Sequence, residues 1–166
     1  RQSGPRGLEE LSMVTWGTGM AALVLGLAPA ATPFDVLDSC FVIQTPRGSV
    51  GTGFLVESHL VATAAHVVED ARVVRLSTAA PDAESFTGTV VFTDATLDVA
   101  LVRLSADPGL ASLTLKRVLP TPGTTVFTIG SPIGELIASR GVVLSAEQSL
   151  IESNTPVDSG SSGGPL

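Results

Sequence analysis

Three residues far apart in the chain have the types and the order needed for nucleophilic catalysis by a serine. His66 lies in the segment TAAHV, Asp98 opens the apolar segment DVAL, and Ser162 lies in GSSGGPL at residues 160–166. A serine hydroxyl is a weak nucleophile until an imidazole accepts its proton, and the imidazole needs a carboxylate to hold its tautomer. The sequence therefore predicts that these three residues form a His-Asp-Ser catalytic triad.

The glycines around Ser162 predict a tight turn that can stabilise negative charge. Glycine adopts backbone conformations that other residues avoid, so Gly160 and Gly163 allow the chain to turn sharply on both sides of the serine. In such a turn the backbone amides of Gly160 and Ser162 can point at the oxyanion of a tetrahedral intermediate. We expect these two amides to form an oxyanion hole.

Other residues of the same types compete for the histidine and aspartate roles. His59 lies in a turn and has the setting of a surface residue, unlike His66. Asp94 lies between Thr93 and Ala95, where turn formation is enough to explain an aspartate. Asp98 begins an apolar strand, in which an unpaired carboxylate would be costly. The sequence therefore favours Asp98 over Asp94 as the partner of the histidine.

The serine-rich stretch offers two further hydroxyls, Ser159 and Ser161, and its composition also resembles a flexible linker. The glycines before and after Ser162, followed by proline, select this serine. The stretch also matches the G-x-S-x-G pattern of α/β-hydrolases. That fold carries its acid and histidine after the serine, whereas His66 and Asp98 precede it, so we reject this alternative.

Composition argues against several other classes of function. The formal net charge is −7, and lysines and arginines form no cluster that would attract nucleic acid. The two histidines and the single cysteine, Cys40, show no spacing typical of metal ligands, and one cysteine cannot form an intrachain disulfide. We expect no metal, no cofactor and no nucleic-acid partner.

The N-terminal region carries a long uncharged segment. No charged residue occurs between positions 11 and 34, and residues 13–31 are mostly Ala, Leu, Val, Gly and Met. This pattern resembles an export signal, with a small-residue cleavage pattern at 28–30. An uncleaved membrane anchor is the alternative, because the run is close to the length that spans a bilayer; a buried core helix is a weaker one. We interpret residues 1–33 as an export signal or anchor plus leader.

Residues 34–166 read as short β-like runs separated by turn residues, without helix-length periodic segments. This pattern favours an all-β fold of antiparallel barrels. The first series contains six candidate strands: 41–45, 50–57, 60–63, 73–77, 87–93 and 99–104. The second series contains four: 113–118, 125–130, 136–146 and 150–153. We expect a first barrel over about residues 39–105 and a second, incomplete one over about 112–166.

Six segments, in this order, resemble the trypsin-fold serine proteases of the HtrA/Deg type. They are GTGFLV at 51–56, ATAAHVV at 62–68, DVALVRL at 98–104, IGSPIG at 129–134, GVV at 141–143 and GSSGGPL at 160–166. The resemblance implies two six-stranded antiparallel β-barrels with the active site in the cleft between them. It also implies a serine endopeptidase that acts on unfolded or damaged polypeptides. Such a protein would be exported to the periplasm, cell envelope or exterior, and would form a homo-oligomer.

The sequence departs from this family in two places. Two further strands follow Gly-Gly-Pro-Leu in the family, so we expect a second barrel that lacks its last two strands and a chain that is poorly active by itself. The residue before the nucleophile is usually asparagine in this group and is Ser161 here, a change that we expect to be tolerated because the oxyanion donors are backbone amides. Animal digestive relatives carry an aspartate there, and because Ser161 has no charge to pair with a new N-terminus, zymogen activation by that route is not expected.

The same resemblance predicts the substrate preference and leaves two other functions open. Alignment on Ser162 puts the base of the specificity pocket at Pro156, with Val157 beside it, and predicts a small or medium aliphatic substrate side chain. One alternative function is a non-catalytic peptide-binding or chaperone-like module on the same fold. The other is a membrane-tethered regulatory protease.

Overall fold

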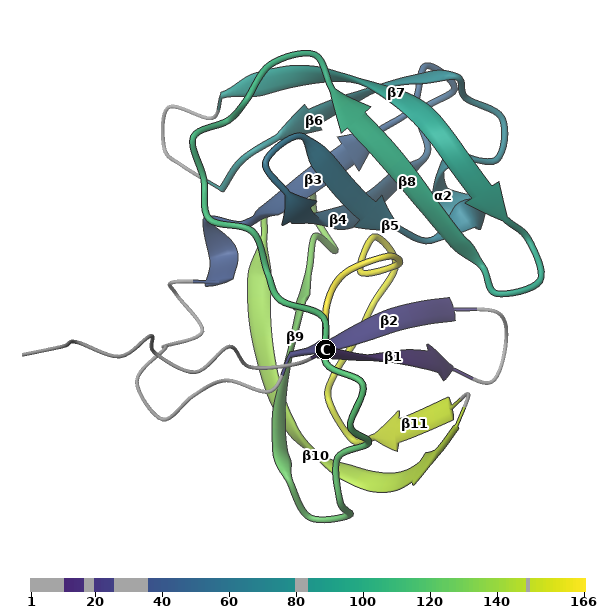
Figure 1. Ribbon diagram of the computed structural model, residues 1–166, viewed down its shortest axis with the longest axis vertical. Helices are drawn as coiled ribbons and strands as arrows, with labels where there is room; N and C mark the ends of the chain where they lie inside the picture. The colour runs from purple at the N-terminus through teal and green to yellow at the C-terminus, as the bar shows by residue number, and fades with distance from the viewer. Residues whose placement is uncertain (1–10, 17–19, 26–35, 80–83, 149) are drawn as a thin grey trace, which may run out of the picture.

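The structure is a computed structural model that describes residues 11–16, 20–25, 36–79, 84–148 and 150–166. Two β-units lie one above the other in the view of Figure 1. The upper unit is a closed barrel and the lower one is a partial sheet. A short helix, α2 (Ala65–Val68), accompanies the upper barrel. The expected all-β class is confirmed.

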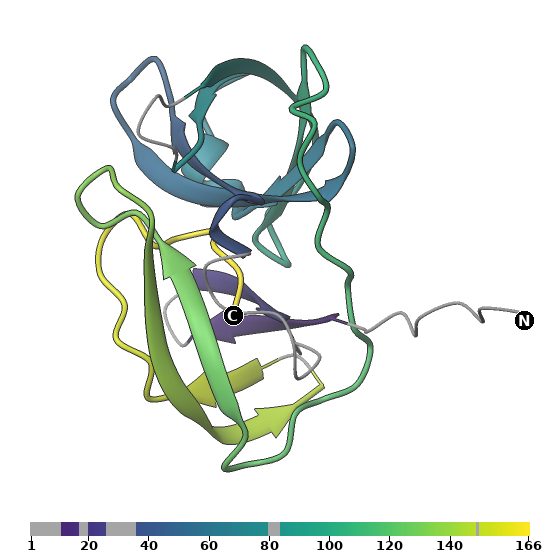
Figure 2. The same cartoon turned by 90° about the vertical axis from the view of Figure 1, so that its left-hand side faces the viewer.

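Six antiparallel strands close the upper barrel in the order β3-β4-β5-β8-β7-β6. Each strand that we predicted in the first series lies within two residues, at either end, of an observed one. The opening of the barrel is visible at the top of Figure 2. The strands are β3 (Cys40–Gln44), β4 (Val50–Glu57), β5 (Leu60–Thr63), β6 (Val73–Ser77), β7 (Ser85–Asp94) and β8 (Val99–Leu104).

Aliphatic side chains fill the inside of this barrel. Leu55, Leu76, Val61 and Val102 are fully buried and belong to one hydrophobic cluster. Along β5, β6 and β8 the buried residues alternate with less buried ones, as the two-residue period of a strand requires, whereas β4 is buried continuously from Gly51 to Leu55. Gly88 on β7 leaves room for two of them, because a Cβ at this position would lie 2.6 Å from Leu76 Cδ1 and would overlap Val102. The glycine therefore leaves room for side chains from both strands that flank β7, which are β6 and β8.

The lower unit is a three-stranded antiparallel sheet in the order β11-β10-β9. Its strands are β9 (Thr125–Gly130), β10 (Ile137–Glu147) and β11 (Leu150–Ser153). A small buried cluster packs on it and includes the last residue of the chain; its members are Val126, Val143, Ile151 and Leu166. These three strands match the last three that we predicted for the second series.

The strand that we expected over residues 113–118 was wrong. The segment forms no strand and runs as an irregular connection from the upper to the lower unit. Leu113 N donates to Leu55 O of the upper barrel at 2.7 Å. The apolar residues that suggested a strand are instead exposed; Leu115 and Val118 are examples. A strand needs a continuous ladder on a neighbour, and apolar composition alone does not supply one.

The N-terminal region contributes a hairpin of β1 (Leu11–Trp16) and β2 (Met20–Leu25). β1 lies against β11 of the lower unit. The alternative of a core helix is therefore wrong for residues 11–16 and 20–25, which form paired strands. In the part of the chain that the structure describes, no helix is long and apolar enough to cross a membrane. The remainder of residues 1–33 lies outside the described residues, and the export signal or anchor stays a prediction.

The barrel core predicts a large difference between two leucine variants. Leu76→Ala removes a fully buried side chain and should lower the free energy of unfolding by about 2–5 kcal/mol. Leu115 is 50% exposed, so Leu115→Ala is the matched control. The control should change stability by less than about 0.5 kcal/mol. Urea unfolding followed by circular dichroism measures both, and equal effects would contradict the assigned core.

Candidate active site

His66 and Asp98 form a hydrogen-bonded pair at one end of the upper barrel. His66 lies on α2, directly after β5, and Asp98 immediately precedes β8. The imidazole Nδ1 lies 2.7 Å from Asp98 Oδ2, and the backbone N–H of His66 donates to Asp98 Oδ1 at 2.9 Å. The carboxylate therefore holds both the ring and the backbone of the histidine. With its proton on Nδ1, a neutral imidazole leaves Nε2 as the proton acceptor.

The backbone of Asp98 adopts a conformation that is rare outside glycine. Its φ is 52°, in the left-handed region, where aspartate is tolerated better than most residues. The carbonyl of Asp98 accepts a hydrogen bond from Ala65 N at 3.1 Å, which helps to hold this conformation. Such backbone strain costs on the order of 1–3 kcal/mol and is typical of functional sites. The strained turn directs the carboxylate toward the histidine. The side chain of Asp98 is 15% exposed, against 40% for that of His66.

The competing residues have ordinary structural roles. Asp94 Oδ1 accepts hydrogen bonds from Thr96 N at 2.8 Å and Leu97 N at 3.0 Å, as in a turn. His59 is exposed, and its Nδ1 lies 2.9 Å from Ser58 Oγ. In the described chain, neither residue makes a hydrogen bond to a member of the predicted triad.

The loop that carries Ser162 packs on the upper barrel. Ser162 O accepts a hydrogen bond from Thr52 N on β4 at 2.8 Å. Gly163 fits so closely that a Cβ there would lie 2.6 Å from Ala64 N, two residues before His66. The serine and the histidine therefore lie on adjoining segments. Within the described residues, however, no hydrogen bond joins the Ser162 hydroxyl to the His66 ring, so the complete triad stays a prediction.

The amides expected to form the oxyanion hole lie in a tight turn. Gly160 has φ 94°, which only glycine adopts readily. Ser161 N, between the two predicted amides, donates to Asp158 O at 3.0 Å. The amides of Gly160 and Ser162 donate to no acceptor in the described part of the chain. They are available to an anion, and their role as an oxyanion hole stays a prediction.

Pro156 and Val157 follow β11 and are both exposed. The segment is held just before them, because Thr155 is buried and its hydroxyl lies 2.6 Å from Ser153 Oγ. The two residues are accessible to a substrate side chain. Their assignment as the base of a specificity pocket stays a prediction.

Two hydroxyl residues near this site were not predicted. Thr52 on β4 and Ser131 after β9 are fully buried between the two units, and Thr52 Oγ1 donates to Gly160 O at 2.8 Å. Both lie in segments that carry the family resemblance, GTGFLV and IGSPIG. Each is a small polar residue next to a glycine, and its local sequence gives no sign of a partner in the other unit. Only the fold shows that the two lie together.

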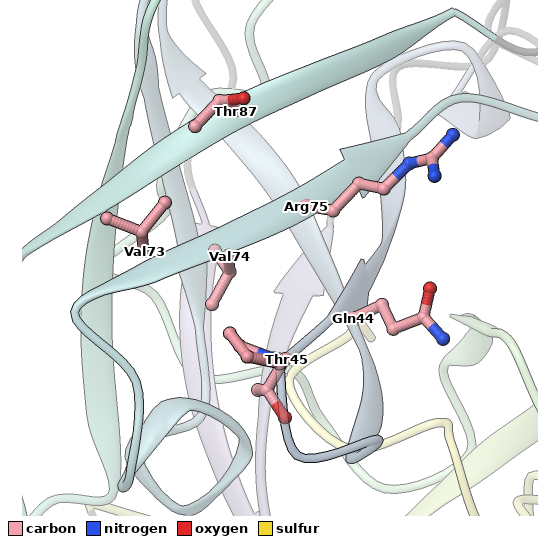
Figure 3. A pocket seen from close by; sticks show the side chains of 7 residues that line it. Gln44, Thr45, Val73, Val74, Arg75 and Thr87 are labelled. Carbon is pink, nitrogen blue, oxygen red and sulfur yellow. The ribbon is translucent and has the colours of Figure 1, made fainter.

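Other features of the described chain offer no competing reactive centre. Burial raises the pKa of the Cys40 thiol, which is fully buried and donates to Val36 O at 3.3 Å. No group of three potential metal ligands gathers among the residues that are described. A hollow of about 340 Å³ on the wall of the upper barrel, shown in Figure 3, includes no residue of the predicted triad. Its one charged residue, Arg75, donates to Ser85 Oγ at 2.9 Å.

A family model described as the trypsin-like peptidase domain matches residues 51–166. The matched range begins in β4 and continues to the last residue, so it includes strands of both β-units. It also contains all three residues of the predicted triad.

The chain is similar to curated serine proteases over most of its own length. Serine protease HTRA2, mitochondrial, from Bos taurus is 32% identical over an alignment of 163 residues that covers 89% of this chain and 35% of that protein. A probable periplasmic serine endoprotease DegP-like from Marinomonas sp. (strain MWYL1) is 33% identical over an alignment of 140 residues that covers 74% of this chain and 28% of that protein. The chain thus spans about a third of the length of the curated relatives that it matches.

Solved structures share the fold. An inactive form of Rv3671c from M. tuberculosis H37Rv has a TM-score of 0.71 at 25% identity, covering 86% of this chain and 77% of that one. The serine endoprotease from Yersinia pestis has a TM-score of 0.71 at 17% identity, covering 83% of this chain and 53% of that one. The expected trypsin-like architecture is therefore confirmed.

The geometry around His66 predicts different effects for two aspartate variants. In the full-length protein, Asp98→Asn should lower kcat for a peptide substrate by about 10⁴-fold, because an amide favours the wrong imidazole tautomer. Asp94→Asn, the matched control, changes only a turn and should leave kcat within about threefold, since it removes no contact to His66. Steady-state kinetics on both variants make the measurement. A loss confined to Asp94→Asn would show that the carboxylate was wrongly assigned.

Proposed function

Because the chain belongs to the trypsin-like peptidase domain family and is of the HtrA/Deg type, we propose that it is the catalytic region of a serine endopeptidase. The observation that carries this proposal is the hydrogen-bonded pair of His66 and Asp98 beside the glycine-framed loop of Ser162. Each part of this arrangement has a defined task in peptide-bond hydrolysis.

In the proposed reaction, the Ser162 hydroxyl attacks the substrate carbonyl carbon while His66 Nε2 accepts the hydroxyl proton. Asp98 stabilises the imidazolium, and the amides of Gly160 and Ser162 bind the oxyanion. The imidazolium then donates its proton to the leaving amine, and an acyl-enzyme forms. Water, deprotonated by His66, attacks this ester and releases Ser162 with its proton restored.

The proposed substrates are unfolded or damaged polypeptides. A protease cleft must admit an extended backbone, which a folded protein rarely presents, and the matched relatives are named as serine proteases or endoproteases. We also propose that the protein is exported, to the periplasm, cell envelope or exterior. The support is the export-signal or anchor pattern in residues 13–31 and a relative named as periplasmic. Assembly as a homo-oligomer is proposed from the family resemblance.

One observation favours a second candidate function, a non-catalytic peptide-binding or chaperone-like module. The hydroxyl of Ser162 makes no hydrogen bond to His66 within the described chain. Catalytic hydrogen bonds are often long without substrate and shorten in the complex, so this observation does not outweigh the His66–Asp98 pair. The two functions differ in whether peptide binding leads to cleavage.

The proposed nucleophile is tested by Ser162→Ala in the full-length protein, with an unfolded protein such as casein as substrate. The variant should lose about 10⁶-fold in kcat, because it lacks the attacking oxygen, and should keep its fold. Ser159→Ala changes a nearby exposed serine and should keep the parent rate. A fluorophosphonate probe should label the parent and the control but not Ser162→Ala. Undiminished casein cleavage by Ser162→Ala would overturn the assignment.

The exposed Pro156 and Val157 predict a preference for a small or medium aliphatic side chain before the cleaved bond. Burial of such a side chain is favourable by about 1.5–3 kcal/mol, whereas an unpaired lysine ammonium against these apolar residues would be unfavourable. Peptides that differ only by valine, alanine or lysine at this position should therefore give a kcat/KM at least about tenfold higher for the aliphatic residues. Dominant cleavage after lysine or arginine would contradict the pocket assignment.

A further inference from the structure

Two hydroxyl side chains are buried together where the two β-units meet. Thr52 lies on β4 of the upper barrel, and Ser131 directly follows β9 of the lower sheet. Both are fully buried, and their hydroxyl oxygens lie 3.2 Å apart. A buried hydroxyl needs a hydrogen-bond partner, so the groups that these two bind are fixed in place.

Thr52 binds the loop of the predicted nucleophile at two points. Its backbone N–H donates to Ser162 O at 2.8 Å, and its Oγ1 donates to Gly160 O, also at 2.8 Å. Its own carbonyl accepts from Thr63 Oγ1 at 2.7 Å. Thr63 ends β5, three residues before His66. One residue thus connects the strand that leads to the histidine with the loop of the serine.

Ser131 also donates hydrogen bonds to the carbonyl of Gly160. Its backbone N–H lies 3.3 Å from Gly160 O and its Oγ lies 3.2 Å from it, while Oγ is also 3.2 Å from Gly51 O. A carbonyl oxygen has two lone pairs, and donors from Thr52 and Ser131 are enough to occupy both. The Gly160 carbonyl is therefore saturated by groups inside the protein.

This arrangement determines which way the loop presents its polar groups. The carbonyls of Gly160 and Ser162 are both bound by Thr52, whereas the amides of the same two residues have no acceptor in the described chain. A Cβ at Gly160 would overlap Ser131 O, so the loop is also in tight contact there. Rotation of the Gly160 carbonyl away from Thr52 would leave buried polar groups without partners, which is unfavourable.

We propose that the Thr52 hydroxyl, supported by Ser131, is a positioning group that keeps Gly160 in the conformation that binds the oxyanion. This inference rests on the proposed peptidase function. Thr52 touches neither substrate nor reacting atoms, and acts through the carbonyl of Gly160. Loss of its hydroxyl should weaken binding of the transition state more than binding of the substrate.

The test compares three variants of the full-length protein. Thr52→Val removes the hydroxyl and keeps the branched shape, Thr52→Ser keeps the hydroxyl, and Thr45→Val is the matched control. Thr45 is also a buried threonine of the upper barrel, and its hydroxyl accepts only from Ser49 N, at 3.1 Å, in the described chain. We expect Thr52→Val to lower kcat by about ten- to a hundredfold with KM within about threefold, a smaller loss than removal of an oxyanion donor itself. Thr52→Ser and Thr45→Val should keep kcat within about threefold of the parent, since neither removes the bond to Gly160.

A second measurement separates positioning from simple loss of stability. A peptide aldehyde forms a tetrahedral adduct with the serine and needs the oxyanion site, so its inhibition constant should rise in Thr52→Val by about the same factor as kcat falls. Assays are run well below the melting temperature of each variant. If Thr52→Val does not fold, Ser131→Ala decides the question, because it removes a donor from the same carbonyl and should lower kcat at least about threefold.

The possible failures are distinguishable. An active parent with an undiminished kcat in Thr52→Val overturns the inference alone. Equal decreases of kcat in Thr52→Val and Thr45→Val would also overturn it, and so would a rise in KM without a fall in kcat, because both results indicate a general structural effect. A parent that neither cleaves casein nor reacts with the fluorophosphonate overturns the proposed function and this inference together.

Discussion

The loop of Ser162 depends on very close contact with both β-units. A Cβ at Gly163 would lie 2.5 Å from Thr52 O and 2.6 Å from Ala64 N on the upper unit, and one at Gly164 would overlap Ile129 O on β9 of the lower unit. No other residue fits at these two positions without movement of backbone atoms. The loop can therefore lie between the two units only because its sequence supplies consecutive glycines. The resulting proximity brings Ser162 next to the segment of His66.

The closed barrel gives the other half of the site a rigid support. The turn before β8 and the helix after β5 begin from neighbouring antiparallel strands, which pair from Leu60 with Arg103 to Thr63 with Ala100. This register brings Asp98 to His66 although 32 residues separate them. A barrel without free edges cannot change this register without breaking several ladders at once. The strain in the backbone of Asp98 is thus opposed by the stability of the barrel.

The sequence predicted features that depend on local pattern and missed those that depend on assembly. The barrel strands were found because β-branched runs alternate with turn residues, and Asp98 was found because a carboxylate at the start of an apolar strand needs a partner. Residues 113–118 also form a short run with leucine, threonine and valine, but nothing local reveals the lack of a neighbouring strand. Thr52 and Ser131 were missed for a related reason: 79 residues separate them, and their hydrogen bond exists only after the two units meet.

Hydrogen bonds and packing hold this site without a covalent crosslink. Val67 stands where animal digestive relatives have a cysteine after the histidine, and it packs so close to Gly51 that a Cβ there would lie 2.5 Å from Val67 Cγ1. Cys40 is buried elsewhere as a free thiol. An apolar contact between α2 and β4 is therefore present at this position instead of a covalent crosslink. The Thr52 hydrogen bonds, which join the upper unit to the loop of Ser162, can open without breaking a covalent bond. The two halves of the site are therefore coupled reversibly, and their alignment depends on the stability of the interface between the units.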